Sequence, residues 1–211
     1  MTESAGVFVF GASGHAKVVI DALERVAAAK VLFVCDDAAA KHGAVLMGYQ
    51  VVGGRAELLA RRSETNVGIV TIGDNSIRER VADWLIDNGC SLTSVVHPSA
   101  TVAREVEIGN GTVVMAGCVI NSGTRVGRNV IINTGATVDH DCELGDSVHV
   151  APGSHLCGHV TVGAGTLIGA GTTIIPGVRV GKSAVVGAGS TVLANVPDGA
   201  RAGGSPCRLL T

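Results

Sequence analysis

Aromatic side chains are scarce in this sequence of 211 residues, since phenylalanine, tyrosine and tryptophan together make up 2% of it. So few large rings cannot fill a bulky globular core throughout, which favours thin layers of aliphatic side chains. An excess of positive charge is also lacking, because the formal net charge is −2. Without a basic surface, neither nucleic acid nor an anionic membrane is an expected partner.

Long apolar runs are missing as well. No stretch approaches the ~20 apolar residues that a membrane-spanning helix requires. The first residues do not show the charged segment, apolar segment and cleavage site of a signal peptide. The six cysteines form no CxxC motif and show no even disulfide spacing. We therefore expect a cytoplasmic protein with reduced, structural thiols.

A period of six residues runs from Val96 to Val192, where an aliphatic residue occupies every sixth position without exception. This period fits neither a helix nor an ordinary strand and is typical of a solenoid. The position four after each of these residues carries a small side chain, and glycine often follows them directly, as at Gly145 and Gly163. Each unit is thus predicted to be a short strand and a corner, with about eighteen residues in a three-sided coil.

The residues before this segment alternate apolar runs with a helical pattern. Strands are expected at 7–10, 31–34 and 67–72, and a helix at 16–28. Alternating strands and helices predict a small parallel sheet of the Rossmann-like α/β class. The chain is therefore divided into an N-terminal α/β domain and a C-terminal solenoid domain. The predicted domains comprise residues 1–94 and 95–211.

Glycine and polar residues follow the carboxyl ends of these strands, where ligands of parallel sheets bind. The candidates are Gly14, His15, Asp36, Asp37, Gly73, Asp74 and Asn75. The glycines read G-x-x-G-H, which departs from the dinucleotide fingerprint, so NAD is disfavoured. A glycine turn at a helix N-terminus can still approach a phosphate, and paired acids can accept hydrogen bonds from a ribose or base. A nucleotide is expected here, and a solvated turn without a ligand is the alternative.

The segment Asp139-His140-Asp141 places an acid on each side of an imidazole at a predicted corner. A carboxylate that contacts the imidazole raises its basicity, as a general base near neutral pH requires. Because neighbouring side chains alternate in direction, only one of the two acids is expected to reach it, and the sequence leaves open which. Asn133, one coil face earlier, could add an amide to the same region.

Histidines are clustered in the same stretch of the solenoid. They are His140, His149, His155 and His159. Such a cluster suggests a zinc enzyme of the gamma-type carbonic anhydrase kind as an alternative. Zinc needs converging ligands and a free coordination position, and the spacing offers no obvious triad within one subunit. We therefore expect no metal.

Four segments together resemble the nucleotide-sugar N-acetyltransferases, which belong with the sialic acid O-acetyltransferase family. They comprise residues 11–19, 72–75 with Arg78, 96–100 and 132–142, and the similarity extends to 203–208. These bacterial enzymes acetylate the 4-amino group of a dideoxy sugar. The resemblance covers essentially the whole chain and implies that the solenoid is a left-handed parallel β-helix.

The resemblance also implies roles for particular residues. His140 would be the general base, and Asp141 would raise its basicity, either directly or through a water because aspartate is shorter than the glutamate common there. The N-terminal candidates would bind the nucleotide sugar. Positions near acetyl-CoA would be Asn133, His149, Ala170 and Ala188, the last standing where glycine is common. The implied assembly is a homotrimer with acetyl-CoA as co-substrate and no metal.

The expected function is acetyl-CoA-dependent N-acetylation of a nucleotide-linked 4-amino-4,6-dideoxy sugar by direct transfer, within O-antigen or glycan assembly. The sequence does not choose between UDP-, GDP- and dTDP-linked sugars, although residues 114–117 and 133–141 favour the perosamine enzymes slightly. O-acetylation of sialic acid or another sugar is the alternative within enzymes. A binding or scaffolding solenoid without catalysis is the alternative from another class.

Overall fold

The structure is a computed structural model that describes residues 5–26 and 29–210. Its contacts divide the chain into two compact units, Met1–Pro98 and Ser99–Thr211. Among the helices of the described ranges, none combines the length and the apolar character that a bilayer crossing would require.

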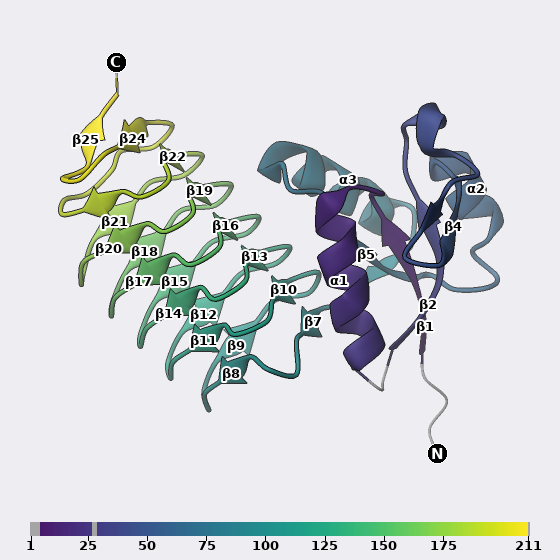
Figure 1. Cartoon of the computed structure of the whole chain (residues 1–211), viewed down its shortest axis with the longest axis horizontal. Coiled ribbons are helices and arrows are strands. Elements are labelled where there is room, and N and C mark those ends of the chain that lie inside the picture. Colours follow the sequence, from purple (N-terminus) through teal and green to yellow (C-terminus); the bar gives the residue numbers. More distant parts are fainter. Residues whose placement is uncertain (1–4, 27–28, 211) are drawn as a thin grey trace. The chain divides into compact units, whose positions relative to one another are not determined.

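The first unit is built on a six-stranded sheet in the order β3-β4-β2-β1-β5-β6, in which only the β3–β4 pair is antiparallel. Its strands are β1 (Ala5–Phe10), β2 (Ala29–Cys35), β3 (Val45–Leu46), β4 (Tyr49–Gly53), β5 (Val67–Val70) and β6 (Ser91–Leu92). Its helices are α1 (Gly14–Arg25), α2 (Arg55–Ala60) and α3 (Asn75–Asp87), with a 3-10 turn η1 (Ala39–Lys41). The short strand β7 (Val95–Val96) follows the sheet in the chain. The predicted parallel α/β unit is confirmed (Figure 1).

Several boundaries differ from the sequence prediction. Strands β1 and β2 each begin two residues earlier than predicted, and β2 ends one residue later, at Cys35. Helix α1 begins two residues before the predicted start and ends at Arg25, because the backbone of Val26 is already extended, with ψ at 109°. Residues 27–28, which were also expected to be helical, lie outside the described residues. Strand β5 ends at Val70, two residues before the predicted end.

The few aromatic rings are concentrated in the first unit. All three phenylalanines lie on β1 and β2 and are buried, and the rings of Phe8 and Phe33 stack with their centroids 6.2 Å apart. Gly68 on β5 is packed under Phe8, so that a Cβ there would collide with the ring. The solenoid segment contains no aromatic residue. The scarce rings therefore form the one bulky core, and aliphatic layers form the other.

The second unit is a parallel β-helix of two-residue strands, which stack into three faces (Figure 1). Face 1 consists of β10 (Val113–Val114), β13 (Ile131–Ile132), β16 (His149–Val150), β19 (Leu167–Ile168) and β22 (Val185–Val186), followed by β24 (Arg201–Gly203) and β25 (Arg208–Leu209). Face 2 consists of β8 (Thr101–Val102), β11 (Val119–Ile120), β14 (Thr137–Val138), β17 (His155–Leu156), β20 (Thr173–Ile174) and β23 (Thr191–Val192). Face 3 consists of β9 (Glu107–Ile108), β12 (Arg125–Val126), β15 (Glu143–Leu144), β18 (Thr161–Val162) and β21 (Arg179–Val180).

The six-residue period explains this architecture residue by residue. Aliphatic residues such as Val138, Leu156 and Ile174 are buried and lie above one another on successive coils. Glycine after such a residue permits close packing of the corners, since a Cβ on Gly145 would lie 2.6 Å from the backbone nitrogen of Ala164 in the next coil. The chain thus returns to the same face after eighteen residues, as the hydrogen-bonded pair of Thr137 and His155 illustrates. The predicted β-helix is confirmed.

Candidate active site

His140 lies at the corner between faces 2 and 3, directly after β14. Its Nδ1 is 2.8 Å from Oδ2 of Asp141. Oδ1 of Asp139 instead accepts hydrogen bonds from the backbone N–H of His140 and from the side-chain amide of Asn121, both at 2.8 Å. Asp141 is therefore the acid that contacts the imidazole, without an intervening water, and Asp139 shapes the corner.

The electrostatics of this corner favour a basic imidazole. The hydrogen bond that the imidazole donates to Asp141 is the main cause that raises the pKa of His140, and the negative charges of Asp139 and Asp141 add to it. The hydrogen bond from Asn121 is the main cause that lowers the pKa of Asp139, so that acid stays ionised. The side chain of His140 is 52% exposed. It is therefore a solvent-accessible base with one nitrogen oriented by a carboxylate.

The coils on either side leave room for these two side chains. A Cβ on Gly158, in the next coil, would lie 2.6 Å from both Cε1 and Nε2 of His140. A Cβ on Gly123, in the preceding coil, would lie 2.5 Å from Oδ1 of Asp141. His159 follows Gly158 and approaches Asp141 as well, with 3.8 Å between its Nε2 and Oδ2. Neither the two glycines nor His159 was among the site residues predicted from sequence.

The residues predicted near acetyl-CoA lie at the other end of face 2. Asn133 follows β13 at the corner between faces 1 and 2, and its side-chain nitrogen is 3.2 Å from Nε2 of His149 on β16. Ala170 and Ala188 are exposed at the same corner of later coils, and the backbone N–H of Gly189 donates to the carbonyl of Ala170. Within one chain Asn133 therefore contacts His149, the two alanines lie at the same corner of later coils, and His140 lies at a different corner.

The N-terminal candidates gather at the carboxyl ends of β1, β2 and β5, as expected for a parallel sheet. A pocket of about 330 Å³ opens at this edge and includes Asp36 and Asp37. Gly14 begins α1 and is exposed, and a Cβ there would meet no atom within 4 Å. His15 in the first turn of the helix is partly buried. The helix N-terminus therefore presents open space beside the pocket.

Asp36 is buried and already has protein partners. Its carboxylate accepts hydrogen bonds from the backbone N–H groups of Ala12 and Ala38, at 2.7 and 2.9 Å, and from Nζ of Lys41 at 2.7 Å. Burial by itself would raise its pKa, but the hydrogen bonds from these three donors outweigh burial and the pKa is lowered. Asp36 therefore holds the loops that shape the pocket, whereas Asp37 is exposed and pairs with Arg55 at 3.0 Å.

A buried arginine fixes the loop between β5 and α3 by hydrogen bonds. Arg78 donates to the carbonyls of Ile72 and Gly73 and to the side-chain oxygen of Asn75. Burial lowers its pKa to about 10, which leaves it charged at neutral pH. Asp74 caps α3 by accepting from the backbone N–H of Ile77 at 2.8 Å. Gly73, Asp74 and Asn75 are thus positioned by the start of the helix.

Sequence reasoning missed the cations of this pocket. Lys41, Arg55 and Arg80 all line it, and the guanidinium of Arg55 also lies over the ring of Trp84, 4.6 Å from its centroid. None belongs to a recognisable motif. Arg55 could have been found from sequence, because it closely follows strand β4, whose end lies at the same edge of the sheet.

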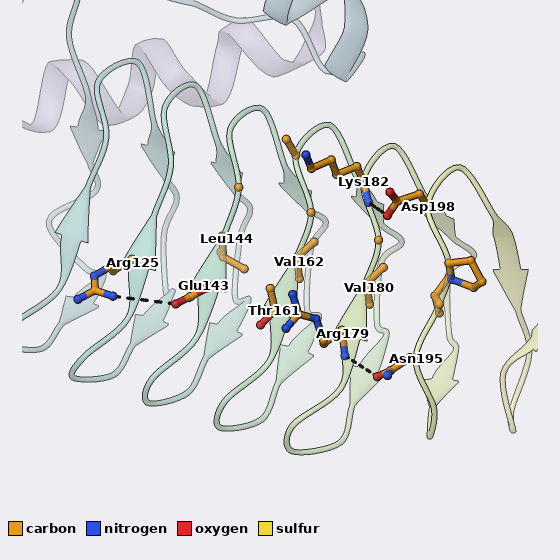
Figure 2. A pocket seen from close by; sticks show the side chains of 16 residues that line it. Arg125, Glu143, Leu144, Thr161, Val162, Arg179, Val180, Lys182, Asn195 and Asp198 are labelled. Atoms are coloured by element: carbon orange, nitrogen blue, oxygen red, sulfur yellow. Dashed lines mark hydrogen bonds and ion pairs between the residues drawn. The ribbon is translucent and has the colours of Figure 1, made fainter.

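A larger groove of about 870 Å³ runs along face 3, and none of the site residues predicted from sequence lines it. Figure 2 shows Arg125, Glu143 and Arg179 along one row of strands, and Lys182 and Asp198 toward another side of the coils. Both signs of charge are mixed there, with Arg125 within 4.0 Å of Glu143. We place the chemistry at His140, because its imidazole is oriented by a carboxylate and no comparable candidate for a general acid or base was identified among the described residues that line this groove.

A zinc triad of histidines does not form within the described part of the chain. His149 contacts Asn133, and Nδ1 of His155 lies 2.9 Å from the hydroxyl of Thr137 on face 2. The one cluster of potential metal ligands found among the described residues combines His140 and His159 with Asp141. Among the described residues, the three histidines that the carbonic anhydrase alternative requires do not come together.

A β-helix of hexapeptide units with an imidazole base at a corner defines the class of hexapeptide-repeat acyltransferases. Comparison with known proteins supports this class in both units. Residues 6–85 match the PglD N-terminal domain, and residues 105–140 and 159–194 match the bacterial transferase hexapeptide family.

Solved structures match over the whole chain. A variant of perosamine N-acetyltransferase from Caulobacter crescentus, in complex with CoA and GDP-perosamine, is 39% identical with a TM-score of 0.94, covering 98% of this chain and 97% of that one. The acetyltransferase domain of PglB from Neisseria gonorrhoeae, in complex with acetyl coenzyme A, is 33% identical with a TM-score of 0.90, covering 98% and 100%. The chain belongs to this family of PglD-type N-acetyltransferases with hexapeptide repeats, as the resemblance in its motifs predicted.

A curated relative is similar over a shorter range. UDP-N-acetylbacillosamine N-acetyltransferase of Bacillus subtilis is 33% identical over 110 residues, which are 52% of this chain and 51% of that protein. The match thus spans about half the length of this relative. The two kinds of relative carry different nucleotides in their names, GDP and UDP.

Proposed function

We propose that this protein transfers the acetyl group of acetyl-CoA to the 4-amino group of a nucleotide-linked 4-amino-4,6-dideoxy sugar. The observation that carries the proposal is the exposed His140, whose Nδ1 lies 2.8 Å from the carboxylate of Asp141. If Nδ1 carries the ring proton and donates a hydrogen bond to Asp141, Nε2 has its lone pair available and can act as a general base.

His140 then acts in a direct transfer of the acetyl group between the two substrates. Nε2 takes a proton from the sugar amine as the amine nitrogen forms a bond to the thioester carbonyl carbon. The bond from this carbon to sulfur breaks as the tetrahedral intermediate collapses, and the thiolate leaves. Because a deprotonated amine is itself a competent nucleophile, the chain needs no covalent intermediate.

The first unit is proposed to bind the nucleotide sugar. Support comes from the pocket at the carboxyl ends of the strands, with the open N-terminus of α1 beside it. Helix N-termini attract phosphate, and exposed Asp37 can accept hydrogen bonds from a base or ribose. Asp36, Gly73, Asp74 and Asn75 are proposed to shape and line this site, with Gly14 and His15 at its helix. In the same proposal, the nucleotide-sugar-binding domain comprises residues 1–94 and the acetyltransferase domain residues 95–211.

The second unit is proposed to bind acetyl-CoA and to act as a homotrimer. Asn133, Ala170 and Ala188 lie at the corner between faces 1 and 2, with His149 beside Asn133 on face 1, whereas His140 lies at the corner between faces 2 and 3. These two corners lie at opposite ends of face 2, so we infer that one β-helix does not contact the same acetyl-CoA with both. A neighbouring copy with closed threefold symmetry can supply the second corner, so each site would combine two subunits.

The cytoplasm is the proposed location. Support comes from the cysteines, since all six are free and four of them are buried. Reduced thiols are the usual state of cysteine in that compartment.

The proposal is tested with a panel of UDP-, GDP- and dTDP-linked 4-amino sugars, acetyl-CoA and detection of released thiol. Comparison of kcat/KM identifies the preferred nucleotide, and matched hydroxyl acceptors test O-acetylation. In parallel, His140→Ala should lose nearly all turnover while binding both substrates. A variant that keeps more than about a tenth of the wild-type rate would remove His140 from the role of base. If neither an amine nor a hydroxyl acceptor is acetylated, a non-catalytic solenoid would be favoured.

A further inference from the structure

The cluster formed by His140, Asp141 and His159 has the donor set of a transition-metal site. Oδ2 of Asp141 lies 2.8 Å from Nδ1 of His140 and 3.8 Å from Nε2 of His159, and the three candidate ligand atoms are all within 4.8 Å of one another. Two imidazoles and one carboxylate suit Zn²⁺ and its neighbours. The geometry points to an inhibitory site for one divalent transition-metal ion. When the ion binds there, the enzyme loses activity. Zn²⁺ is the preferred probe.

The spacing is close to what a tetrahedral ion requires. Ligand bonds of about 2.1 Å in a tetrahedron separate the ligand atoms by about 3.4 Å. The two shorter separations from Asp141, 2.8 and 3.8 Å, lie on either side of this value. Small side-chain rotations therefore suffice to close the site, and water can fill the remaining coordination position.

The backbone of the solenoid holds the ligands in place. Asp141 and His159 occupy equivalent positions in successive coils, and both have left-handed backbones, with φ at 56° and 58°. The backbone N–H of His159 donates to the carbonyl of His140 at 3.0 Å, which ties the two coils together at this corner. Because all three ligand residues belong to these hydrogen-bonded coils, their backbones are fixed in position before the ion binds.

A metal on Nδ1 would abolish the basicity that catalysis requires. The metal takes the lone pair of Nδ1, so the proton of the neutral ring must reside on Nε2. Nε2 is the atom that the proposed function needs free of a proton, and Asp141 is diverted to the ion as well. Metal binding and acetyl transfer thus exclude each other at His140. The inhibition rests on the proposed function, whereas metal binding itself does not.

The three side chains are 52%, 53% and 65% exposed. An exposed site lacks a dry surrounding shell that would lock in an ion. Binding should therefore be reversible, so that a chelator restores the free base. This distinguishes an inhibitory site from a resident catalytic zinc.

Metal binding is measured by titrating Zn²⁺ into the full chain, free of any affinity tag and treated with a chelator, by calorimetry. The informative variant is His159→Asn, since asparagine tolerates the left-handed backbone and removes one imidazole. The matched control is His155→Asn, which removes an exposed histidine on β17 outside the cluster. We expect one ion per chain for the wild type and the control, and at least tenfold weaker binding for His159→Asn. Equal affinity in all three proteins, or none in the wild type, would overturn the site.

Inhibition is measured separately, by chromatography of the acetylated sugar at initial rates, because the free thiol of CoA also binds Zn²⁺. Wild type should lose activity as Zn²⁺ rises and regain it with EDTA. Each protein is compared with its own metal-free rate, and His159→Asn should need at least tenfold more Zn²⁺ for half inhibition. Equal sensitivity of wild type and variant would refute the inhibitory role. If the metal-free wild type transfers no acetyl group, the proposed function fails, while calorimetry still decides the metal site.

Discussion

At the scale of single residues, the candidate site depends on which groups are missing as much as on which are present. Gly158 and Gly123 carry no side chain where the imidazole of His140 and the carboxylate of Asp141 lie across the neighbouring coils. Both positions face the corner that holds the base. The shape of this corner therefore results from four positions in three successive coils.

Replacing Gly158 with alanine should displace the base. The added methyl group would lie 2.6 Å from Nε2 of His140, and the end of the flexible imidazole would move rather than the backbone. We expect kcat to fall about tenfold or more while the melting temperature changes little. Steady-state kinetics and thermal melting measure the two effects.

Gly203→Ala is the control for this experiment, since its Cβ would find no atom closer than 3.6 Å. It should leave both kcat and the melting temperature near wild type. An active Gly158→Ala enzyme would show that the position of Nε2 tolerates displacement, which a general base does not.

Asp36 should make the stability of the first unit depend on pH. Its pKa is lowered because its hydrogen bonds with Lys41 and with the N–H groups of Ala12 and Ala38 outweigh the effect of burial. A lowered pKa stabilises the fold above the unfolded value of about 3.9, and this contribution is lost as the pH falls through the lower, folded-state value. Asp36→Asn should cost about 1–3 kcal/mol at neutral pH.

Urea unfolding at a series of pH values tests this prediction. The difference in the free energy of unfolding between wild type and Asp36→Asn should be largest at neutral pH and shrink below the unfolded pKa. Asp37→Asn, on an exposed side chain, should show a smaller difference. A difference for Asp36→Asn that does not change with pH would exclude the charge as its source.

At the scale of elements, the small inward position of the repeat does more than fill space. Threonine hydroxyls at this position bind the backbone of the corners. The hydroxyl of Thr124 donates to the carbonyl of Asp139 at 2.8 Å and accepts from the N–H of Cys142 at 3.2 Å, so it braces both ends of the corner that carries His140. Thr166 does the same at another corner, for Gly181 and Ala184.

Thr124→Val and Thr166→Val should therefore have equal effects on stability and unequal effects on catalysis. Each leaves a part-buried carbonyl and a buried N–H without the threonine hydroxyl, which costs about 1–3 kcal/mol. Only Thr124→Val loosens the corner of His140, so only it should reduce kcat. Thermal melting and steady-state kinetics provide the comparison. Equal rates in the two variants would mean that this brace does not position the base.

At the scale of the whole molecule, the separation of the two corners predicts that subunits share their sites. His140→Ala and His149→Ala should each be impaired as pure proteins, since one lacks the base and the other a group proposed to contact acetyl-CoA. Co-expression should restore about a quarter of the wild-type activity, because a quarter of randomly mixed interfaces combine an intact His140 with an intact His149.

Analytical ultracentrifugation accompanies this experiment and should give a trimer. The rescue is read at low acetyl-CoA, where loss of His149 has its greatest effect. A mixture no more active than the average of its parents, or a fully active monomer, would contradict a site shared between subunits.

The solenoid could be predicted from sequence because its architecture is almost local. Each six-residue unit needs only one buried aliphatic residue, one small residue and a corner, so the period of the side chains is the period of the fold. The α/β unit was equally predictable in type, since its strands and helices have distinct patterns. Its boundaries moved by one to three residues, because the ends of helices and strands are the parts that a local pattern of side chains defines least.

The contacts of the site could not be read in the same way. Whether Asp139 or Asp141 meets His140 depends on the left-handed backbone of Asp141 and on the bond from Asn121 one coil away. The pocket cations belong to no motif, because Lys41 and Arg55 reach the sheet edge from separate elements.

Sequence alone thus specified the coil, the candidate base and the family, because all three are properties of short segments. The tertiary structure decided which acid serves His140, that His159 joins them, and that Asn133 and His149 lie at a different corner. The physical reason is stacking: strand pairing brings residues eighteen positions apart into contact, and no local pattern of side chains encodes which of them then meet.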